Sequence, residues 1–433
     1  MLRYRSPRTL VGVLFPVLGA LLVMGAILSR SRSMPPRHAD RPVCSPDDGG
    51  LVVPKGFCAL VVAHQLGPVR HIVVAPNGDV FANRERGGVV ALRDTSGDGV
   101  ADVIRPFHTP GGTGIALEGD FLYYSTDDAV YRYPWRAGQL EPEGEAEPIV
   151  VDLPANGDHK SKSIALGPGG ALFVNIGSAT NSCQQQNRAS RSPGRNPCDE
   201  LGGRAGIWRF DASRRGQRFS DGRRWATGLR NTVALAAEPG SRELYGVVQG
   251  RDQLADSWGF SAEKSADNPG EELVRPGQGD DYGWPFCYYD TDLKQKVLAP
   301  EYGGDGKQVG RCGSVKPALA AYPGHWAPMA IAFGDAKQLG SAYANGFFIA
   351  FHGSWNRAPL PQAGYRVVWQ PMAGGRPAGA YQTFASGAKG PTSVRPAGLA
   401  IGPDGSLYIS ADENQTIWRV LNSSGAEGAK EGT

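Results

Sequence analysis

Apolar and polar residues alternate with a period of two in many short segments of the chain, and turns rich in glycine and proline separate these segments. Leu407 and Ile409, for example, alternate with Tyr408 and Ser410 directly after a Pro-Asp-Gly turn. A period of two places successive side chains on opposite faces of a β-strand. The pattern therefore predicts a protein built from many short β-hairpins.

One unit of this pattern occurs six times along the chain. Each copy contains an apolar-Ala-apolar start, a Pro/Gly turn, an alternating strand, a polar turn and a strand with an aromatic or basic residue. The copies begin at Ile72, Ile115, Ile164, Leu235, Ile331 and Leu399. A single copy has too few apolar residues to bury both of its faces, so we expect the copies to pack on one another.

The spacing between the copies indicates the architecture. Their second residues are 43, 49, 71, 96 and 68 positions apart, counted at Val73, Ala116, Ala165, Ala236, Ala332 and Ala400. Four-stranded propeller blades take about 40–50 residues. We therefore predict an all-β, six-bladed β-propeller of four-stranded antiparallel blades over residues 51–422, with long loops after blades three, four and five. We expect the strand Cys58–Ala63 to complete the last blade and close the ring, and residues 423–433 to form a disordered tail.

The first thirty residues differ from the rest of the chain. An uncharged, mostly apolar run of 21 residues, Thr9–Ser29, lies between arginines on both sides. At 1.5 Å per residue, a helix of this length can span a bilayer core of ~30 Å. We expect residues 1–30 to form a hydrophobic helix that acts as a signal peptide or a membrane anchor, followed by a linker over residues 31–50. The body of the protein would then be exported to the periplasm or another extracytoplasmic space, with residues 9–29 as a possible contact with the inner membrane.

Composition and charge exclude several other classes of protein. The 433 residues include 60 Gly and 33 Pro, which argues against coiled coils and helical bundles. The 45 basic and 42 acidic residues nearly balance, so we expect no nucleic-acid partner. The sequence has no His-Glu-x-x-His motif, no P-loop and no Gly-x-Ser-x-Gly motif, which argues against metalloproteases, nucleotide-binding enzymes and lipases.

The six cysteines fall into three pairs of near neighbours. Their separations within the pairs are 14, 15 and 25 residues, and none forms a Cys-x-x-Cys motif. In an oxidising compartment such pairs favour disulfides over metal or redox sites. Although six cysteines allow 15 pairings, proximity in the sequence predicts the bonds Cys44–Cys58, Cys183–Cys198 and Cys287–Cys312.

Polar clusters recur next to the strands of the repeat, where we expect them to face one end of the propeller. The five clusters are Gly157-Asp158-His159, Gly228-Leu229-Arg230-Asn231, Gln249-Gly250-Arg251-Asp252, Gly324-His325-Trp326 and Arg395-Pro396. An imidazole with a pKa near neutrality suits a general base, and His159 lies beside the carboxylate of Asp158. We therefore take these two residues as the candidate catalytic pair.

Two further features have two interpretations each. Asp94, Ser96, Asp98 and Asp102 match the first part of a calcium-binding loop, but Arg105 stands where the final glutamate would be. This segment is either a weak calcium site or a plain Asp/Gly turn. Similarly, Trp284, Trp326 and Trp355 either line a sugar pocket or pack between blades.

Several stretches of the sequence resemble the glucose/sorbosone dehydrogenase family. The resemblance covers Pro54 to Leu421, and its specific segments are GDHKSKSIALGPGGALFVNIGS, WATGLRN, GVVQGRD, EELVRPGQGDDYGWPFC, FHGSWNR and VRPAGLAIGPDGSLYIS. Members of this family are six-bladed propellers that use pyrroloquinoline quinone (PQQ) and calcium to oxidise sugars. The sequence is more similar to the L-sorbosone dehydrogenase branch than to the glucose dehydrogenase type.

The resemblance implies roles for individual residues. His159 would remove a proton from the substrate hydroxyl while hydride passes to PQQ, and the backbone carbonyls of Gly250 and Arg251 would bind calcium. The implied cofactor contacts are Arg230, Asn231, His325, Arg395 and, in place of a family lysine, Arg357. Four family positions differ, because Ala397 replaces an arginine, Ser178 replaces the carboxylate that orients the base, the family lysine has no counterpart at Ser354 or Trp355, and Pro110–Leu117 lacks a glutamine. The hydroxyl of Ser178 or the carboxylate of Asp158 would therefore have to hold the imidazole.

Three functions are compatible with the sequence. The first is an exported quinoprotein oxidoreductase that oxidises an aldose, a sugar aldehyde or a pyranose and passes electrons to an external acceptor. The second is a non-redox propeller that binds a carbohydrate or a protein. The third is a calcium-dependent lactonase-type hydrolase, for which Asn231 and Asp252 are the available side-chain ligands.

Overall fold

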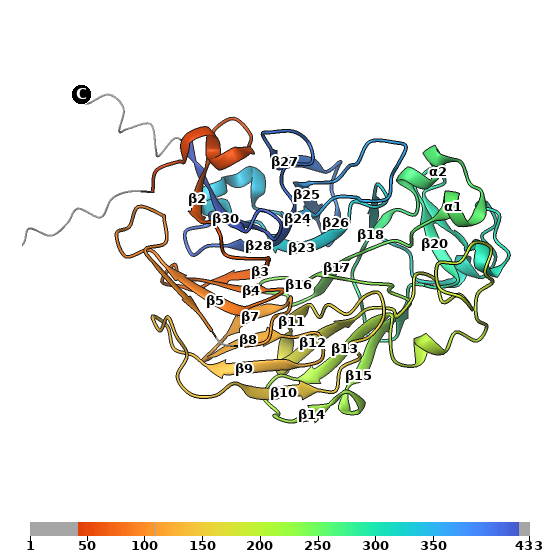
Figure 1. Cartoon of the computed structure of the whole chain (residues 1–433), viewed down its shortest axis with the longest axis horizontal. Helices are drawn as coiled ribbons and strands as arrows, with labels where there is room; N and C mark the ends of the chain where they lie inside the picture. Colours follow the sequence, from red (N-terminus) through yellow and green to blue (C-terminus); the bar gives the residue numbers. More distant parts are fainter. Residues whose placement is uncertain (1–41, 108, 424–433) are drawn as a thin grey trace, which may run out of the picture. The chain divides into compact units, whose positions relative to one another are not determined.

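The computed structural model describes residues 42–107 and 109–423, and six of the seven β-sheets that these residues form are arranged as the blades of a propeller. The innermost strands of the six sheets surround a common centre (Figure 1). Each of the six predicted copies starts on one of these inner strands, which are β3, β7, β11, β16, β23 and β28. The predicted fold and number of blades are confirmed.

The first three blades follow one another along the chain. Blade one consists of β3 (Val69–Val74), β4 (Val80–Arg84), β5 (Gly88–Arg93) and β6 (Val103–Pro106). Blade two consists of β7 (Ile115–Glu118), β8 (Phe121–Ser125), β9 (Val130–Pro134) and β10 (Glu147–Val151), with the short parallel strand β14 (Gln217–Arg218) at its edge. Blade three consists of β11 (Ile164–Leu166), β12 (Ala171–Ile176), β13 (Gly206–Asp211) and β15 (Arg223–Thr227), with β19 (Asp280–Asp281) at its edge.

The last three blades include the two ends of the described chain. Blade four consists of β16 (Ala234–Ala237), β17 (Leu244–Val248), β18 (Glu271–Val274) and β22 (Ala320–Tyr322). Blade five consists of β23 (Pro328–Phe333), β24 (Gly346–Phe351), β25 (Arg366–Ala373) and β27 (Gln382–Gly387), with β1 (Leu51–Val52) and β26 (Arg376–Pro377) at its margins. Blade six consists of β28 (Pro396–Ile401), β29 (Leu407–Ala411), β30 (Thr416–Asn422) and β2 (Phe57–Ala63).

Strand β2 closes the ring as the sequence predicts. It pairs antiparallel with β30 from Phe57 opposite Asn422 to Ala63 opposite Ile417. Residues 45–50, which lie in the predicted linker, also contact this blade, since the Trp418 indole N–H donates to the carbonyl of Gly49 at 3.0 Å. This pairing joins a strand near the N-terminus and three strands near the C-terminus in one sheet, and it thereby closes the ring of blades.

Among the described residues, six of the eight hydrophobic clusters lie between neighbouring blades, and the other two lie in the insertions. Between blades five and six, for example, Phe348 and Trp369 pack with Leu407 and Trp418. Equivalent clusters join blades six and one, one and two, two and three, three and four, and four and five. The copies therefore bury their apolar faces against each other, as expected.

A second set of contacts between blades is polar. The second strand of several blades ends in a polar side chain that donates to the next blade. Asn83 donates to Gly114 O (2.9 Å), Ser125 to Lys162 O (2.6 Å), Gln249 to Pro328 O (3.1 Å) and Ser410 to Arg70 O (2.5 Å). These bonds fix each blade against its neighbour at the end of the propeller where the polar clusters lie.

The long insertions lie inside blades, and the prediction that they follow blades three, four and five is wrong. Residues 177–205 connect β12 to β13, residues 249–270 connect β17 to β18, residues 275–319 connect β18 to β22, and residues 352–365 connect β24 to β25. The spacing between copies counts residues from one inner strand to the next, so it cannot distinguish a loop within a blade from a loop after it.

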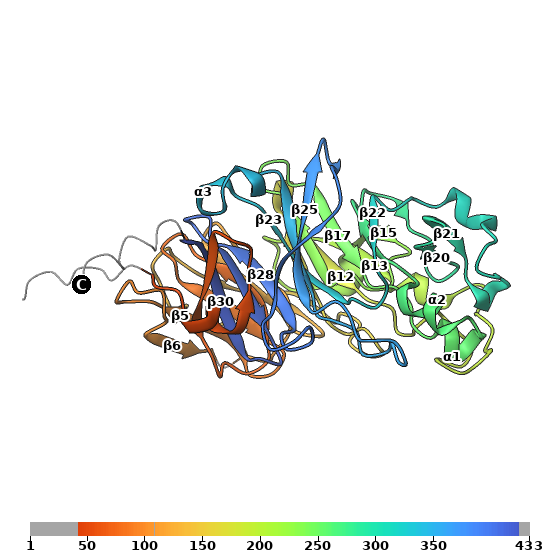
Figure 2. The same cartoon turned by 90° about the horizontal axis from the view of Figure 1, so that it is seen from above.

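The insertions carry most of the secondary structure outside the blades. Helices α1 (Leu254–Trp258) and α2 (Ala262–Asp267) belong to the second insertion, and the hairpin of β20 (Cys287–Asp290) and β21 (Gln295–Leu298) belongs to the third. These elements lie on one side of the blades in both views (Figure 1 and Figure 2). Helix α3 (Ala336–Leu339) lies in blade five, between β23 and β24.

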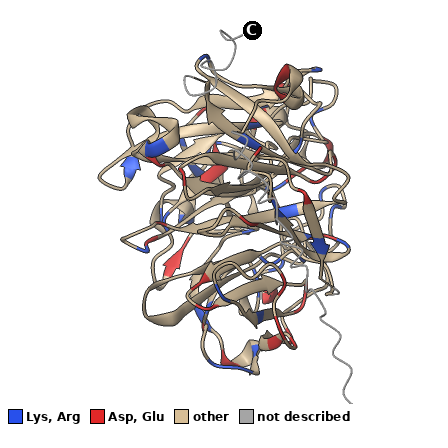
Figure 3. Cartoon of the chain, turned by 90° about the vertical axis from the view of Figure 1, so that its left-hand side faces the viewer, with Lys and Arg blue, Asp and Glu red and all other residues tan. Residues whose placement is uncertain are grey.

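All three predicted disulfides are present, and they join Cys44 to Cys58, Cys183 to Cys198 and Cys287 to Cys312. Basic and acidic segments are interspersed in the view of Figure 3. No helix among residues 42–107 and 109–423 is long and apolar enough to cross a membrane. The predicted hydrophobic helix of residues 1–30 and almost all of the predicted tail lie outside the described residues.

Candidate active site

The predicted polar clusters reach one face of the propeller because of the strand order. In a four-stranded antiparallel blade, the connection between the second and third strands and the connection to the next blade leave at the same end. His159, Arg230, His325 and Arg395 lie in connections between blades, and Gly250 lies between the second and third strands of blade four. The topology therefore explains why residues far apart in the sequence converge.

A cavity of about 250 Å³ opens among these connections. Its lining residues are Asp158, His159, Arg188, Arg230, Gln249, Gly250, Asp252, Glu271, His325, Ala327, Trp355 and Asn356. The structure thus brings together five of the predicted site residues, namely Asp158, His159, Arg230, Gly250 and His325. We take this cavity as the candidate active site.

The imidazole of His159 is held by Ser178. His159 Nδ1 lies 2.9 Å from Ser178 O and 3.0 Å from Ser178 Oγ. A carbonyl oxygen only accepts, so Nδ1 carries the proton, and the Ser178 hydroxyl itself donates to Thr180 O at 2.7 Å. Nε2 therefore carries the free lone pair. Of the two groups that could orient the base, the contacts identify Ser178.

Close packing keeps the His159 ring in place. A Cβ atom added at Gly177 would lie 2.5 Å from His159 Cβ and 2.8 Å from Asn231 Oδ1, so only glycine fits there. The Ser178 N–H donates to Arg230 O at 2.8 Å, which ties the support of the base to the next blade. Burial, with a further contribution from the charge of Arg230, lowers the pKa of His159 from 6.5 to about 3. The imidazole is therefore neutral at pH 7 and able to accept a proton at Nε2.

Among the described residues, Asp158 forms no hydrogen bond with the imidazole and instead pairs with Arg188. Arg188 Nε donates to Asp158 Oδ2 at 2.9 Å, and its Nη1 and Nη2 atoms both lie 3.2 Å from Asp252 Oδ2. Arg188 belongs to the insertion of blade three that the Cys183–Cys198 disulfide closes. One guanidinium thus links the loop that carries the base to the loop of blade four.

Asp252 is the centre of a network of cationic groups. Its Oδ2 atom also accepts from Arg230 Nη2 at 3.0 Å, and its Oδ1 atom lies 3.5 Å from His325 Nδ1 and 2.8 Å from Asn356 Nδ2. Burial opposes ionisation, but Arg230 and His325 hold the pKa of Asp252 well below its usual range. Burial lowers the pKa of His325, but the Asp252 carboxylate outweighs burial and raises this pKa above 6.5.

Glu271 joins two loops of the cavity. Its carboxylate accepts from Gly250 N–H at 2.8 Å and from Ala327 N–H at 3.1 Å. Burial raises the pKa of Glu271 to about 7. The carbonyl oxygens of Gly250 and Arg251 accept no hydrogen bond from any residue that the structure describes, whereas the buried side chain of Arg251 pairs with Glu301 at 2.8 Å. Only the backbone of Arg251 is therefore available as a ligand.

Three predicted cofactor contacts do not line the cavity. The side chain of Asn231 is occupied on both sides, because Oδ1 accepts from Asn175 at 2.9 Å and Nδ2 donates to Gln249 at 3.0 Å. Arg357 pairs with Asp267 at 2.8 Å. Arg395 pairs with Glu413 at 3.0 Å and contacts the Tyr365 hydroxyl (3.2 Å) and His352 Nδ1 (3.3 Å).

The acidic loop of blade one connects β5 to β6 and lies at the opposite end of the propeller from the cavity. Asp94 accepts from the N–H groups of Gly97 (2.6 Å) and Gly99 (2.7 Å), and Asp102 accepts from those of Thr95 (2.6 Å) and Ser96 (2.9 Å). The Asp98 carboxylate accepts from the Val100 N–H at 2.8 Å. These are the contacts of an Asp/Gly turn, and calcium binding here stays a prediction.

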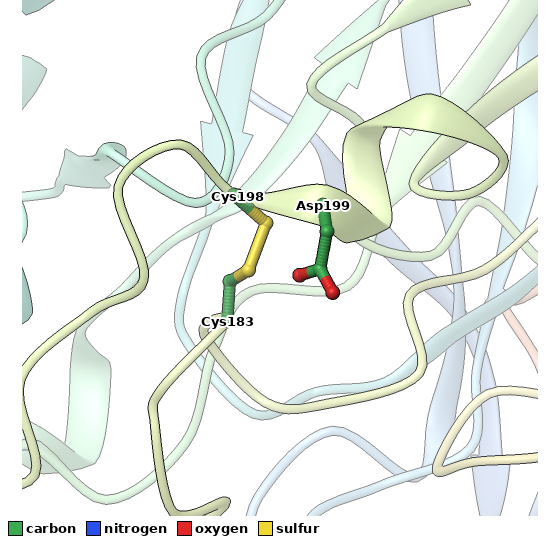
Figure 4. A group of neighbouring side chains, drawn as sticks. All are labelled: Cys183, Cys198 and Asp199. Carbon is green, nitrogen blue, oxygen red and sulfur yellow. A yellow bond between two sulfur atoms is a disulfide. The ribbon is translucent and has the colours of Figure 1, made fainter.

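Within the described ranges, one group of three His, Cys, Asp or Glu side chains brings its ligand atoms within 4.8 Å of one another. It consists of Cys183, Cys198 and Asp199 (Figure 4). The two sulfur atoms form a disulfide, so they are not thiolates that could bind a metal.

Sequence reasoning missed Arg188, Glu271 and Asn356. Arg188 lies in an insertion that has no counterpart in the repeat, so no pattern points to it. Glu271 is the first residue of β18, and the alternating pattern does not distinguish it from an ordinary strand residue. An acidic residue at a strand position that the repeat buries is the signal that could have found it. The tryptophans separate clearly, since Trp284 and Trp326 are each 6% exposed and Trp355 is 67% exposed.

Comparison with known families and proteins gives a consistent result. The family described as TrAA12-like matches residues 51–423. The chain is 25% identical over 348 residues to a pyrroloquinoline quinone-dependent sugar dehydrogenase of Hypocrea jecorina, a match that covers 74% of this chain and 76% of that protein. It is also 30% identical over 199 residues to an uncharacterized protein of Borreliella burgdorferi, of which the match covers 48%.

Two solved structures have the same fold. The Trichoderma reesei protein of Carbohydrate-Active Enzymes Family AA12 superposes with a TM-score of 0.72 and 22% identity, over 86% of this chain and 98% of that one. The PQQ domain of a pyranose dehydrogenase from Coprinopsis cinerea, in its holo form, superposes with a TM-score of 0.70 and 20% identity, over 89% and 98% of the two chains. At these identities the likeness concerns the fold.

Proposed function

This chain belongs to the TrAA12-like family, and from that membership we propose that it is a PQQ-dependent dehydrogenase that oxidises a sugar, with His159 as the general base. Relatives named as PQQ-dependent sugar and pyranose dehydrogenases support the reaction class. A pyranose or a sugar aldehyde is the expected substrate. The protein is expected to act outside the cytoplasm and to deliver electrons to an external acceptor.

The observation that carries this proposal is the state of His159. Oxidation of a sugar hemiacetal to a lactone removes a proton from the hydroxyl and a hydride from the carbon. Because Ser178 O holds the proton on Nδ1, Nε2 is free to take the hydroxyl proton. The pKa of about 3 keeps this nitrogen unprotonated at neutral pH. Two further histidines, His325 and His352, contact carboxylates. Nε2 of His325 lies 2.7 Å from Ser265 O, so this nitrogen already has a hydrogen-bond partner.

The cavity suits an anionic, planar cofactor such as PQQ, an ortho-quinone with carboxylate groups. Arg188 and Arg230 line its wall beside Asp158 and Asp252, with which they pair, and Asn356 Oδ1 is a buried acceptor without a partner among the described residues. The carboxylates of PQQ would share the guanidinium groups of Arg230 and Arg188 with these two aspartates through charged hydrogen bonds. When bound, PQQ supplies the two-electron acceptor that amino-acid side chains lack. Arg230, only 4% exposed, would also stabilise negative charge near it.

The loop that follows β17 suits calcium. Calcium prefers oxygen ligands, and the carbonyls of Gly250 and Arg251 are free to act as such. Glu271 fixes this backbone by accepting the Gly250 N–H. The lactonase-type alternative has less support, because the side chains of Asn231 and Asp252 are already engaged with other protein groups.

The test is reduction of a dye by purified protein supplied with PQQ, calcium and a panel of aldoses and sugar aldehydes. We expect His159→Ala to lower the rate by about 10²–10⁴-fold, the usual contribution of a general base, while PQQ still changes its absorbance on binding. The matched control is His352→Ala, which removes an imidazole from the neighbouring polar cluster, and we expect it to retain most of the activity. If PQQ gives no absorbance change and no sugar reduces the dye, the non-redox propeller is the better interpretation.

A further inference from the structure

The indole of Trp355 has an unusual position at the candidate active site. We propose that Trp355 is a binding platform for a second sugar ring, and that the substrate is the end of an oligosaccharide. The ring that reacts would lie in the cavity with His159, and the adjoining ring would lie on Trp355. The inference rests on the proposed function and names the substrate class of the same site.

Trp355 differs from the other two candidate tryptophans in its exposure. Trp284 and Trp326 are each 6% exposed and belong to buried clusters, whereas Trp355 is 67% exposed. Single exposed apolar residues are common and need no function. Trp355 is different because its side chain lines the cavity that contains the candidate base.

The residues around Trp355 hold its backbone firmly. On one side, the Ser354 hydroxyl donates to Gln362 Oε1 at 2.6 Å and accepts from the Ala363 N–H at 2.9 Å. On the other side, Asn356 donates to Asp252 at 2.8 Å and Arg357 to Asp267 at 2.8 Å. An aromatic side chain on a fixed backbone loses little further freedom when a ligand stacks on it.

A second, small hollow lies next to the candidate active site, and Trp355 and Asn356 line both. The hollow measures about 60 Å³, and its other lining residues come mainly from α1 and α2 and the loop after Trp355. Gln253, Asp256 and Arg357 give it polar side chains. A hollow of this volume is too small to enclose a sugar ring, so a ring there would lie across its mouth.

The combination of an aromatic face and polar neighbours favours a sugar ring. The C–H face of a pyranose is apolar and packs on an aromatic ring, while its hydroxyls form hydrogen bonds around the edge. The only cation of the hollow, Arg357, is already paired with Asp267, so the hollow has no free positive charge for an anionic ligand. Because Trp355 lines both hollows, a ligand with two linked rings can place one ring in the cavity and the other on the indole.

The test compares ligands that bind without being oxidised at the anomeric carbon. Calorimetry on the protein with PQQ and calcium would measure the dissociation constants of methyl glycosides of glucose and of glucose disaccharides with different linkages. We expect at least one disaccharide glycoside to bind about tenfold more tightly than the monosaccharide, as stacking on one aromatic ring allows. Trp355→Ala should remove this difference and Trp355→Phe should keep most of it.

The control is Leu293→Ala, which shortens another exposed apolar side chain, 42% exposed, in the β20–β21 hairpin. It should leave both dissociation constants unchanged. Equal binding of all glycosides to the unaltered protein, or an equal loss for mono- and disaccharides in Trp355→Ala, would overturn the inference. Neither result affects the dye assay, so oxidation of monosaccharides alone would preserve the proposed function and reject the oligosaccharide.

Discussion

Asp252 in blade four and Asp412 in blade six follow the second strand of their blades, and each is surrounded by the same types of side chain. Asp252 contacts His325 at 3.5 Å and Arg230 at 3.0 Å. Asp412 contacts His352 at 2.8 Å and Arg70 at 3.2 Å. An acid–histidine–arginine cluster thus occurs twice on one face, although the histidines and arginines come from different positions of the repeat.

The two clusters differ in the loops around them. In blade six, only residues 412–415 connect the second strand to the third, whereas the corresponding connections of blades three, four and five are 177–205, 249–270 and 352–365. Around Asp412, Arg395 fills the space by pairing with Glu413 and lying 4.8 Å above the Tyr365 ring. The two clusters therefore contain the same types of side chain but differ in the loops beside them, and residues of the insertions, such as Arg188, line the cavity at Asp252.

The largest difference should appear when each aspartate is removed. In Asp252→Ala, Arg230 and His325 remain buried, with side chains only 5% and 4% exposed. Removing one partner of a buried ion pair costs about 3–5 kcal/mol. Urea denaturation should therefore show a loss of this order in the free energy of unfolding. Asp412→Ala should cost at most about 2 kcal/mol, because Arg70 and His352 are 16% and 17% exposed and water can reach them. Equal losses would contradict the distinction between the clusters.

A smaller effect should appear in the pH dependence of stability. His159 has a lowered pKa of about 3, so the unfolded state binds more protons below pH 6.5 and this group makes the protein less stable as the pH falls. His325 has a raised pKa, so its contribution is present below pH 6.5 and is lost as the pH rises. Between pH 7.5 and 5, His159→Gln should therefore lose less free energy of unfolding than the unaltered protein, by about 2 kcal/mol.

The same experiment on His325→Gln provides the opposite control. This variant should lose more stability than the unaltered protein over the same pH range, because the favourable protonation beside Asp252 is gone. Denaturant titrations at several pH values measure both slopes. A change of the same sign in the two variants would contradict the opposite directions in which the cavity shifts the pKa values of His159 and His325.

The smallest effect concerns the support of the base. His352 contacts a carboxylate, whereas His159 contacts the carbonyl and hydroxyl of Ser178. In Ser178→Ala the carbonyl still holds the Nδ1 proton, and losing one hydrogen bond is worth about 1 kcal/mol. Dye reduction should therefore slow by only about fivefold. A loss as large as that of His159→Ala would mean that the hydroxyl does more than orient the ring.

The sequence was sufficient to predict the frame. The inner strands, the closing strand Phe57–Ala63 and the three disulfides depend on local patterns, namely alternation, turn residues and cysteine proximity. The positions of the insertions could not be predicted, because the spacing between copies does not show which loop of a blade contains the additional residues. Periodicity describes the repeated part and says nothing of the residues that interrupt it.

The candidate site was predictable only where it follows the repeat. His159, Arg230 and His325 stand in equivalent connections, so their convergence could be expected. Arg188 and Asn356 reach the cavity from insertions, and their positions depend on contacts that the sequence does not reveal, such as the bond of Asn356 to Asp252. Asn231 also lies in a connection between blades. Its side chain, however, forms hydrogen bonds with Asn175 and Gln249.

The pairing of β2 with β30 has a consequence for the order of folding. Phe57 lies opposite Asn422. Strand β2, the first long strand to leave the ribosome, therefore cannot pair until β30, the last strand, has been synthesised. Contacts between residues so far apart form late, since a long loop must be closed first. During synthesis the apolar segment Phe57–Ala63 is therefore an unpaired strand that other chains could capture. A chaperone that covers this segment until synthesis ends would be expected to raise the yield of folded protein.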